Sequence, residues 1–575
     1  MPYRNLDEFL IRLEQTGELI HITSPVIDPT EITTAVITQM QKPEDRNKAL
    51  WFDSVNDSPF PLVTNLFSTH KRMAWALGFD RLDAIQARMR DLVTIETPIS
   101  FGALLNKGGT LLNAVRNAGL GGPQSRGAPV QAIQHLTAPS LAMFPAMRWQ
   151  PEETHPSLTM VQIIISDQLT ATATTTQHVH LDRAMIFDEY TLGIKASLLP
   201  EDSQEPIPAA IVLGSDPAAT WSAGHPLPAG LDPYWIGGWI RRRPVPLLKG
   251  LTQAIHVPAD AEIVIEGWID PQSRRRDVVF AGEDGQYISG LPFATLQVTA
   301  ITYRKDAVFP VSIPGIPRGD RQWMTYASEQ LFLPILQTLL KGLSDIRLPP
   351  DGPPGSVIIA SCHCHSPGQA YKIIHGLWGM SYLEMPRTIV VVDDTIDPHD
   401  EASVLNAILT RVEWSEDVVF TRSYNSTVYP ESLSASLITQ IGIDATGPTR
   451  VTRGAEWQTS EREAGPHGAY VIWHDLRVIA VKMQSNEPDL ITQATRWLDS
   501  DYKDYHVLLV KEDVDIYDAA RLAKYVLAHV AWGENVRTRQ SVGGRTPLLI
   551  NLLDVCHKHP VVIQPQQSHS NDASG

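Results

Sequence analysis

The stretch Met160–Phe187, MVQIIISDQLTATATTTQHVHLDRAMIF, decides the fold. It is rich in Thr, Ile and Val, a composition that favours adjacent β-strands. A second β-rich block follows Ala261, reading AEIVIEGWID and then LQVTAITYRKDAVFPVSI. The segment between the two blocks reads as helix in pieces, because prolines interrupt it. The middle of the chain is therefore predicted to be a β-containing domain.

Helical patterns flank this domain on both sides. Apolar residues recur at helical spacing in the first segment, at Leu6, Phe9, Leu10 and Leu13, and Thr30–Met40 reads as a second helix. After Gln322 a helix pattern leads to SVIIASCHCH and RTIVVVDDTIDPHDEASVLNAILTRV, which alternate strand and helix. This alternation predicts an α/β domain with a partly parallel sheet. Asp397 is the predicted N-cap of its second helix, with Pro398 at the first helical position.

A repeat relates Val392–Val418 to Val510–Val536 at an offset of 118 residues. Nine of the 27 aligned positions are identical, and both copies place an Asp-x-x-Asp turn between an apolar strand and a helix. We interpret the repeat as a duplicated strand–helix unit. The alternative is convergence of two unrelated units on the same helix-capping chemistry.

Composition restricts the class of protein. The 575 residues carry 47 basic and 64 acidic side chains, so the formal charge is 47 − 64 = −17. The acidic balance disfavours a nucleic-acid partner, and no apolar run is long enough to span a membrane. Three cysteines, Cys362, Cys364 and Cys556, cannot build a disulfide framework and fit a reducing compartment. We therefore expect a cytoplasmic, multidomain protein.

Two histidine-containing segments are candidate binding sites. In Gln177–Arg183, strand geometry places His178, His180 and Asp182 on one face and Arg183 on the other. A His-x-His pair suits a metal or a phosphate, and the alternative is a strand end with solvated histidines.

The second segment is Cys362-His363-Cys364-His365, after an apolar strand. Adjacent side chains on an extended strand point to opposite faces, so these four side chains cannot all bind one ion. A structural zinc site would need Cys556-His557-Lys558-His559 as its other half. A strand end that lines a pocket is the favoured interpretation.

Two charged segments complete the candidates. Arg274–Asp277 and Gly282–Gly285 place carboxylates near guanidinium groups, as acid–base chemistry requires, although surface hairpins have the same composition. Arg241–Arg243 can bind a carboxylate or a phosphate, or can simply end a helix.

The order of these segments resembles the UbiD family of prenylated-flavin-dependent decarboxylases. The resemblance covers about residues 3–447 and includes the motifs YRNLDEFLIRLEQTGELIHITSPV, AIVLGSDPAATWSAGHPLP, VPADAEIVIEGWIDP, SPGQAYKIIHGLWGM and RTIVVVDDTIDPHD. It implies an α/β (α+β) protein with a central split β-barrel of flavin-reductase type. The expected domains are an N-terminal α/β domain (1–115), the barrel domain for cofactor and substrate (116–322), a C-terminal α/β oligomerisation domain (323–450), an extension with the repeat (451–562) and a disordered tail (563–575).

The resemblance also implies site residues. The family has an arginine flanked by two acids beside prenylated FMN, whose phosphate is bridged by a divalent metal with potassium alongside. Arg183 matches the family arginine, and Glu283 matches the acid that shuttles the proton. Asp277 is the chemically sensible match for the other acid.

The chain departs from the family at the cofactor anchor. The family's metal ligands are Asn, His and Glu, and His178 stands at the asparagine position. The segment SLLPE, where the family has its metal-binding histidine, contains no histidine. Asp232 lies one residue from the position of the family's metal-binding glutamate. His178 and Asp232 are therefore the candidate metal ligands. The candidate cofactor-binding residues are His178, His180, His363 and Cys364.

Three functions remain open from the sequence. The first is non-oxidative decarboxylation or carboxylation of an aromatic or α,β-unsaturated carboxylic acid with prenylated FMN. The second is decarboxylation of an electron-rich aromatic acid without this flavin, by metal or acid–base chemistry. The third is a non-catalytic assembly subunit. The resemblance leads us to expect a homo-oligomer, either a dimer or a hexamer.

Overall fold

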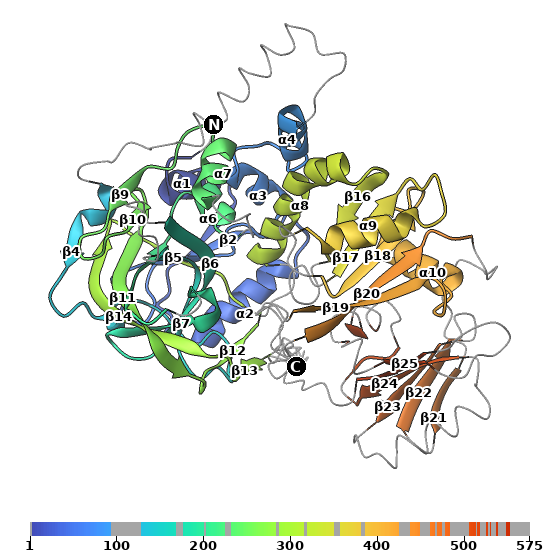
Figure 1. The fold of residues 1–575 in the computed structure, drawn as a ribbon. Helices are drawn as coiled ribbons and strands as arrows, with labels where there is room; N and C mark the ends of the chain where they lie inside the picture. Colours follow the sequence, from blue (N-terminus) through green and yellow to red (C-terminus); the bar gives the residue numbers. More distant parts are fainter. Residues whose placement is uncertain are drawn as a thin grey trace, which may run out of the picture.

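The computed structural model is shown in Figure 1. It describes residues 3–93, 128–167, 176–200, 203–224, 232–282, 287–314, 319–349, 357–380, 386–424, 437–448, 461–465, 468–473, 478–483, 505–512, 514–517, 522, 525–526, 530, 536–538 and 548–552. None of the helices in these ranges has the length and apolar character needed to cross a lipid bilayer.

The N-terminal part contains a small mixed sheet with the strand order β1-β2-β3-β15. β1 and β2 are parallel, β2 and β3 antiparallel, and β3 and β15 parallel. The last strand comes from beyond the barrel, so the chain returns to complete this sheet. The elements are α1 (Leu6–Gln15), β1 (Leu19–Ile22), α2 (Pro29–Met40), β2 (Ala49–Phe52), β3 (Leu62–Thr64), α3 (His70–Ala76), α4 (Ala84–Val93) and β15 (Phe309–Val311).

The two predicted N-terminal helices are confirmed. In α1 the buried side chains are Leu6, Phe9, Leu10 and Leu13, and the side chain of Asn5 caps the first turn. α2 begins one residue before the predicted start, because Asp28 accepts a hydrogen bond from the Thr30 N–H and Pro29 occupies the first helical position.

The central domain is a closed six-stranded antiparallel barrel, which confirms the predicted β-barrel. Its strands follow the order β11-β8-β5-β6-β7-β14, and β14 pairs back to β11. Closure leaves no free edge among these six strands. They are β5 (Ser157–Asp167), β6 (Thr176–Ile186), β7 (Thr191–Lys195), β8 (Ile207–Leu213), β11 (Ile263–Arg275) and β14 (Phe293–Tyr303).

Short elements surround the barrel. β4 extends the sheet beside β14, β9 pairs with β10, and β12 pairs with β13. They are η1 (Pro129–Gln131), β4 (Ile133–His135), η2 (Leu141–Met143), η3 (Ala196–Leu198), α6 (Pro217–Ser222), α7 (Pro233–Ile240), β9 (Leu247–Lys249), β10 (His256–Pro258), β12 (Val279–Ala281) and β13 (Tyr287–Ser289).

The C-terminal α/β unit has a five-stranded sheet with the order β16-β17-β18-β20-β19. The three inner strands are parallel and the two outer ones antiparallel to their neighbours. The long helix α8 follows β15 of the N-terminal sheet and leads to β16, the first strand of this sheet (Figure 1). The elements are α8 (Asp320–Leu339), β16 (Leu343–Arg347), β17 (Val357–Cys362), α9 (Gln369–Trp378), β18 (Thr388–Asp393), α10 (Glu401–Arg411), β19 (Val418–Tyr424) and β20 (Leu437–Ala445).

The predicted N-cap of α10 is wrong by three residues. Asp400 caps the helix, because its carboxylate accepts hydrogen bonds from the N–H groups of Ala402 and Ser403. The Asp397 carboxylate instead accepts from the His399 N–H and forms a turn before the helix. Both aspartates are suitable N-cap residues. Pro398 suggested Asp397, because proline favours the first helical position, but the helix begins three residues later.

A second sheet follows the first and repeats its topology. Its order is β21-β22-β23-β24-β26-β25, with β23, β24 and β26 parallel and β22 and β25 antiparallel to their neighbours. The offset of 118 residues maps β18 onto β24 and the start of β19 onto the start of β25. The elements are β21 (Glu461–Gly465), β22 (Gly468–Trp473), β23 (Val478–Met483), β24 (His506–Lys511), β25 (Val536–Thr538) and β26 (Leu548–Asn551).

The two sheets bury equivalent residues in one shared hydrophobic cluster. Equivalence is defined by the strand pairing next to β18 and β24, because the offset differs from 118 residues in the neighbouring strands. The equivalent pairs are Val357 and Val478, Ile359 and Ala480, Val390 and Leu508, Val392 and Val510, Ile441 and Leu548, Ile443 and Ile550, and Ala445 and Leu552. The rings of Trp414 and His506 also meet between the copies, with centroids 6.1 Å apart. One chain thus brings together two copies of the same unit through corresponding positions.

A buried carboxyl group joins α8 to the first of these sheets. Glu329 of α8 accepts a hydrogen bond from the Leu348 N–H at 2.9 Å, and Arg347 Nη1 lies 3.5 Å from the same oxygen. Burial raises the pKa of Glu329 to about 8, against the opposing charge of Arg347. Glu329 is therefore mostly neutral at pH 7 in the folded protein.

We predict that Glu329→Gln removes a pH-dependent loss of stability. Between the ordinary glutamate pKa of 4.5 and about 8, the unfolded chain releases a proton that the folded chain retains. The free energy of unfolding of the wild type thus falls as the pH rises through this window, by about 4 kcal/mol relative to the variant. Thermal midpoints of both proteins at pH 5, 6.5 and 8 measure this difference.

The matched control is Glu189→Gln, which makes the same change at an exposed residue. Its thermal midpoint should differ from that of the wild type by a constant amount at all three pH values. A constant difference for Glu329→Gln as well would contradict the prediction.

Candidate functional site

Strand β6 carries the predicted histidine pair. His178, His180 and Asp182 alternate along it, opposite Ile165, Ile163 and Val161 of β5. Burial lowers the pKa of His180. The charge of Asp182 acts to raise this pKa, and His178 lowers it further, but both effects are smaller than that of burial. His178 is exposed, and the next residue after Asp182, Arg183, is buried.

Arg183 is held by a carboxylate that the sequence analysis did not identify. Its Nη1 donates to Glu153 Oε1 at 2.9 Å, and the Glu153 side chain is fully buried. The same oxygen accepts from the Ala281 N–H at 3.1 Å. The other oxygen accepts from the N–H groups of Trp149 and Gln150, at 2.7 and 3.2 Å. Glu153 therefore ties β6 and β12 to the turn that precedes β5.

A second ion pair lies beside the first. Lys195 Nζ, at the end of β7, donates to Asp182 Oδ1 at 2.9 Å. Although burial acts to raise it, the pKa of Asp182 is lowered, by the charge and hydrogen bond of Lys195 and by the Arg183 N–H. The Phe280 ring lies 5.3 Å from the Arg183 guanidinium and 5.6 Å from Lys195 Nζ. Two cations thus contact one aromatic ring at this end of the barrel.

Asp277, one of the two acids expected around Arg183, pairs with a different arginine. Asp277 pairs with Arg275 at 2.7 Å, and both side chains are substantially exposed. The hydrogen bond from Arg275 lowers the pKa of Asp277 to about 2. The structure thus places Glu153, instead of Asp277, against Arg183. Glu283 lies outside the described residues, between β12 and β13.

The expected metal ligands do not form a cluster. Asp232 caps α7 by accepting from the Tyr234 N–H at 2.9 Å, and burial raises its pKa. His178 lies on β6. Within the described parts of the chain, no three His, Cys, Asp or Glu side chains are placed to hold a metal ion. These residues do not fit the metal-bridged phosphate anchor that the resemblance implies.

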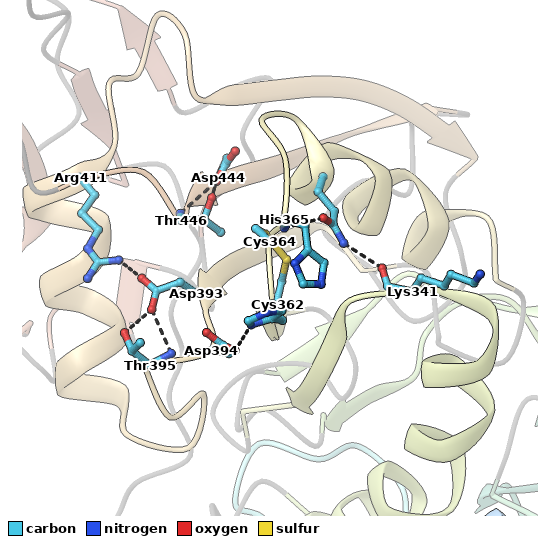
Figure 2. Close-up of a disulfide and its surroundings, with 12 residues drawn as sticks. Lys341, Cys362, Cys364, His365, Asp393, Asp394, Thr395, Arg411, Asp444 and Thr446 are labelled. Atoms are coloured by element: carbon cyan, nitrogen blue, oxygen red, sulfur yellow. Dashed lines mark hydrogen bonds and ion pairs between the residues drawn. A yellow bond between two sulfur atoms is a disulfide. The ribbon is translucent and has the colours of Figure 1, made fainter. Parts of the chain in front are cut away.

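His363 and Cys364 lie in the C-terminal sheet, at the carboxyl end of β17. Cys364 is joined to Cys362 by a disulfide (Figure 2). His363 Nδ1 lies 2.5 Å from the carboxylate of Asp394, which follows β18. Three cysteines are too few for a disulfide framework, but two of them lie close enough in the chain to form this local bond, which was not predicted. Cys556–His559 lie outside the described residues, so the paired zinc half-site is not described.

The arginine triplet has structural partners. Arg241 forms a buried ion pair with Asp216, which caps α6. Arg243 Nη2 donates to the Tyr3 carbonyl at 3.1 Å. These two side chains thus bind α6 and the N-terminal segment to the end of α7.

Glu153, Lys195 and Phe280 had no recognisable signal in the sequence. Glu153 lies in PEETHP, which reads as a surface turn. Lys195 is 13 residues from its partner, Asp182. The one indication of a partner was the alternation of side chains in Gln177–Arg183, which places Arg183 on the face opposite the histidines. A buried guanidinium there requires a carboxylate.

The chain matches three family models. They are the N-terminal domain of 3-octaprenyl-4-hydroxybenzoate carboxy-lyase, over residues 10–92, its Rift-related domain, over 123–317, and its C-terminal domain, over 322–445. An uncharacterised protein of Archaeoglobus fulgidus is 30% identical over 465 residues, which are 78% of this chain and 92% of that protein. One of Aquifex aeolicus is 30% identical over 72% of this chain and 86% of its own length.

Solved structures share the fold. Vanillic acid decarboxylase of Sedimentibacter hydroxybenzoicus in its open form matches with a TM-score of 0.62 and 20% identity, over 81% of this chain and 97% of its own. HmfF of Pelotomaculum thermopropionicum, a UbiD-class enzyme in complex with FMN, has a TM-score of 0.61 and 22% identity, over 80% and 97%. The 3,4-dihydroxybenzoic acid decarboxylase AroY of Klebsiella pneumoniae has a TM-score of 0.58 and 18% identity, over 78% and 95%.

We predict that Glu153→Ala destabilises the folded protein by about 3–5 kcal/mol, because it leaves the buried Arg183 and three N–H groups without their acceptor. Urea denaturation followed by tryptophan fluorescence measures the loss, since Trp149 is buried beside Glu153.

Asp277→Ala is the matched control, because it breaks an exposed Arg–Asp pair. It should cost less than about 1 kcal/mol. Equal effects of the two substitutions would contradict a structural role for the Glu153 carboxylate.

Proposed function

Because the chain belongs to the UbiD family of carboxy-lyases, we propose that it decarboxylates an aromatic or α,β-unsaturated carboxylic acid, or carboxylates the product in reverse. The observation that carries the proposal is the Glu153 carboxylate. It holds Arg183 and, through the Ala281 N–H, the start of the segment that contains Glu283. The proposed substrate-binding cation thus shares its carboxylate partner with Ala281, two residues before the proposed acid in the sequence.

Arg183 binds the carboxylate of the substrate in this proposal. Glu153 engages Nη1, and within the described residues the guanidinium makes no other hydrogen bond. Its remaining N–H groups can pair with a carboxylate in two-point geometry. Glu283 delivers the proton to the carbon that loses carbon dioxide. Glu153, in place of Asp277, keeps Arg183 oriented.

The cofactor is prenylated FMN in the first form of the proposal. His178 and His180 share one face of β6, and Lys195 reaches Asp182 on the same face. Their N–H donors suit a phosphate without a bridging metal. When bound, the prenylated flavin supplies the electron sink for the loss of carbon dioxide. HmfF, one of the structural neighbours, has been solved with prenylated FMN, which supports this choice.

One observation favours a second form. The described residues do not provide the metal cluster that would bridge the flavin phosphate. An enzyme without the flavin would act on an electron-rich aromatic acid, whose ring accepts a proton at carbon before carbon dioxide leaves. Arg183 and Glu283 keep the same tasks in this form.

We predict that protein produced together with a flavin prenyltransferase carries flavin absorbance and releases carbon dioxide. The assay measures carbon dioxide from vanillic, 3,4-dihydroxybenzoic and cinnamic acids by mass spectrometry. Protein produced without the prenyltransferase is the control and should be inactive. Colourless protein that releases carbon dioxide would favour the second form. Failure of both preparations on all three acids would contradict the proposed substrate class.

We predict that Glu283→Gln lowers kcat by about 10²–10⁴-fold, because the amide cannot donate the acid proton. Arg183→Lys keeps a cation beside Glu153 but loses two-point pairing, and should lower kcat/KM by about 10²-fold or more.

Asp277→Asn is the matched comparison, since it removes a charge from an exposed carboxylate near the same hairpin. It should retain kcat within about threefold of the wild type. A folded Asp277→Asn protein without turnover would return the orienting role to Asp277.

A further inference from the structure

The sequence Cys362-His363-Cys364-His365 lies where an α/β sheet commonly places reactive groups. It begins with the last residue of β17, Cys362, at the carboxyl edge of the parallel strands. The next parallel strand, β18, ends in Asp393 and is followed by Asp394. Figure 2 shows the disulfide at this edge, with the His365 ring beside it. Nothing in the proposed decarboxylation uses these residues.

The two sulfur atoms have different surroundings. Cys362 is fully buried and belongs to the hydrophobic cluster around α8 and α9. Cys364 is only partly buried, and both flanking histidines are exposed. Cys364 packs against the edge of the same cluster but is the more exposed of the two cysteines, so its sulfur is the better target for an attacking thiolate. Disulfides with one accessible sulfur are the ones that exchange with other thiols.

Hydrogen bonds hold the two cysteines together independently of the disulfide. The His363 N–H donates to the Gly342 carbonyl at 2.8 Å, and the His365 N–H donates to Gln369 Oε1 at 2.9 Å. Gln369 Nε2 in turn donates to the Lys341 carbonyl at 3.1 Å. Gly342 has a φ of +94°, and a Cβ at this position would collide with the Gln369 side chain. The reduced cysteines would thus stay close enough to re-form the bond.

The fold does not need this disulfide. The duplicated sheet has the same topology, and the position equivalent to Cys362 is Met483, at the end of β23. The bond joins residues two apart in sequence, so it restricts the unfolded chain less than a bond across a long loop. In a reducing compartment, moreover, disulfides are usually transient, catalytic or redox-sensing.

We propose that Cys362 and Cys364 are a redox-active dithiol–disulfide pair that exchanges with a dithiol reductant, with Cys364 as the attacked sulfur. A thiolate of the reductant bonds to Cys364 Sγ, the Cys362–Cys364 bond breaks, and Cys362 leaves as a thiolate that takes a proton. The second thiol of the reductant then loses its proton, attacks the mixed disulfide and releases Cys364, which is protonated. Two electrons and two protons pass to the protein, and the reductant becomes a cyclic disulfide.

A redox titration of the full-length protein tests this proposal. The protein is equilibrated with mixtures of reduced and oxidised dithiothreitol, quenched with acid, alkylated in denaturant and analysed by peptide mass spectrometry. We expect the peptide that contains both cysteines to pass from unmodified to doubly alkylated in one two-electron transition. The Cys556 peptide is an internal control and should be alkylated at every ratio. Double alkylation of Cys362 and Cys364 at every ratio would overturn the proposal.

The accessible sulfur is tested with single-cysteine variants in a Cys556→Ser background. In native protein, the Cys364 thiol of Cys362→Ala should react with iodoacetamide at least about tenfold faster than the Cys362 thiol of Cys364→Ser. Equal rates in the two folded variants would overturn the assignment of Cys364. If Cys362→Ala does not fold, brief alkylation of reduced wild type, read peptide by peptide, compares the same two thiols.

Discussion

The Glu153 carboxylate is the constraint on which the site depends. A fully buried charge is stable only if its oxygens are occupied by donors, and Glu153 meets a guanidinium and three backbone N–H groups. These donors come from β6, from β12 and from the turn before β5, so one group fixes three segments of the barrel domain. The positions of the Arg183 guanidinium and of the Ala281 N–H at the end of β12 follow from this contact.

Much of the fold could be predicted because local pattern and tertiary environment agree. The alternation of side chains along β6 and the helical spacing of apolar residues in α1 predict which side chains are buried. Contacts between distant segments could not be read in this way. The pair of Glu153 and Arg183 spans 30 residues, and no local pattern connects the two. The local segment Arg274–Asp277 did place a carboxylate near guanidinium groups, and Asp277 pairs there with Arg275 instead of with Arg183. The choice between Asp397 and Asp400 as cap depended on the length of a turn, which sequence patterns leave undetermined.

The charges of the site are arranged in neutral pairs. Arg183 with Glu153 and Lys195 with Asp182 flank the Phe280 ring, so each cation is compensated where water is scarce. In the proposed reaction, a substrate carboxylate bound by Arg183 would add a negative charge to these balanced pairs. It would then be held by the N–H groups of Arg183 beyond the Glu153 contact, and the net charge of −17 would contribute little to its binding.

The two C-terminal sheets meet through equivalent residues, as two subunits related by a two-fold axis would. In a true dimer one gene encodes both sides, so every substitution appears twice. Here the sides are separate stretches of one chain, and each can change alone while the shared cluster is kept. The strand ends show this freedom, because Cys362 and Asp393 of the first copy correspond to Met483 and Lys511 of the second. The strand ends of the two sheets thus differ while the buried residues between the sheets remain apolar.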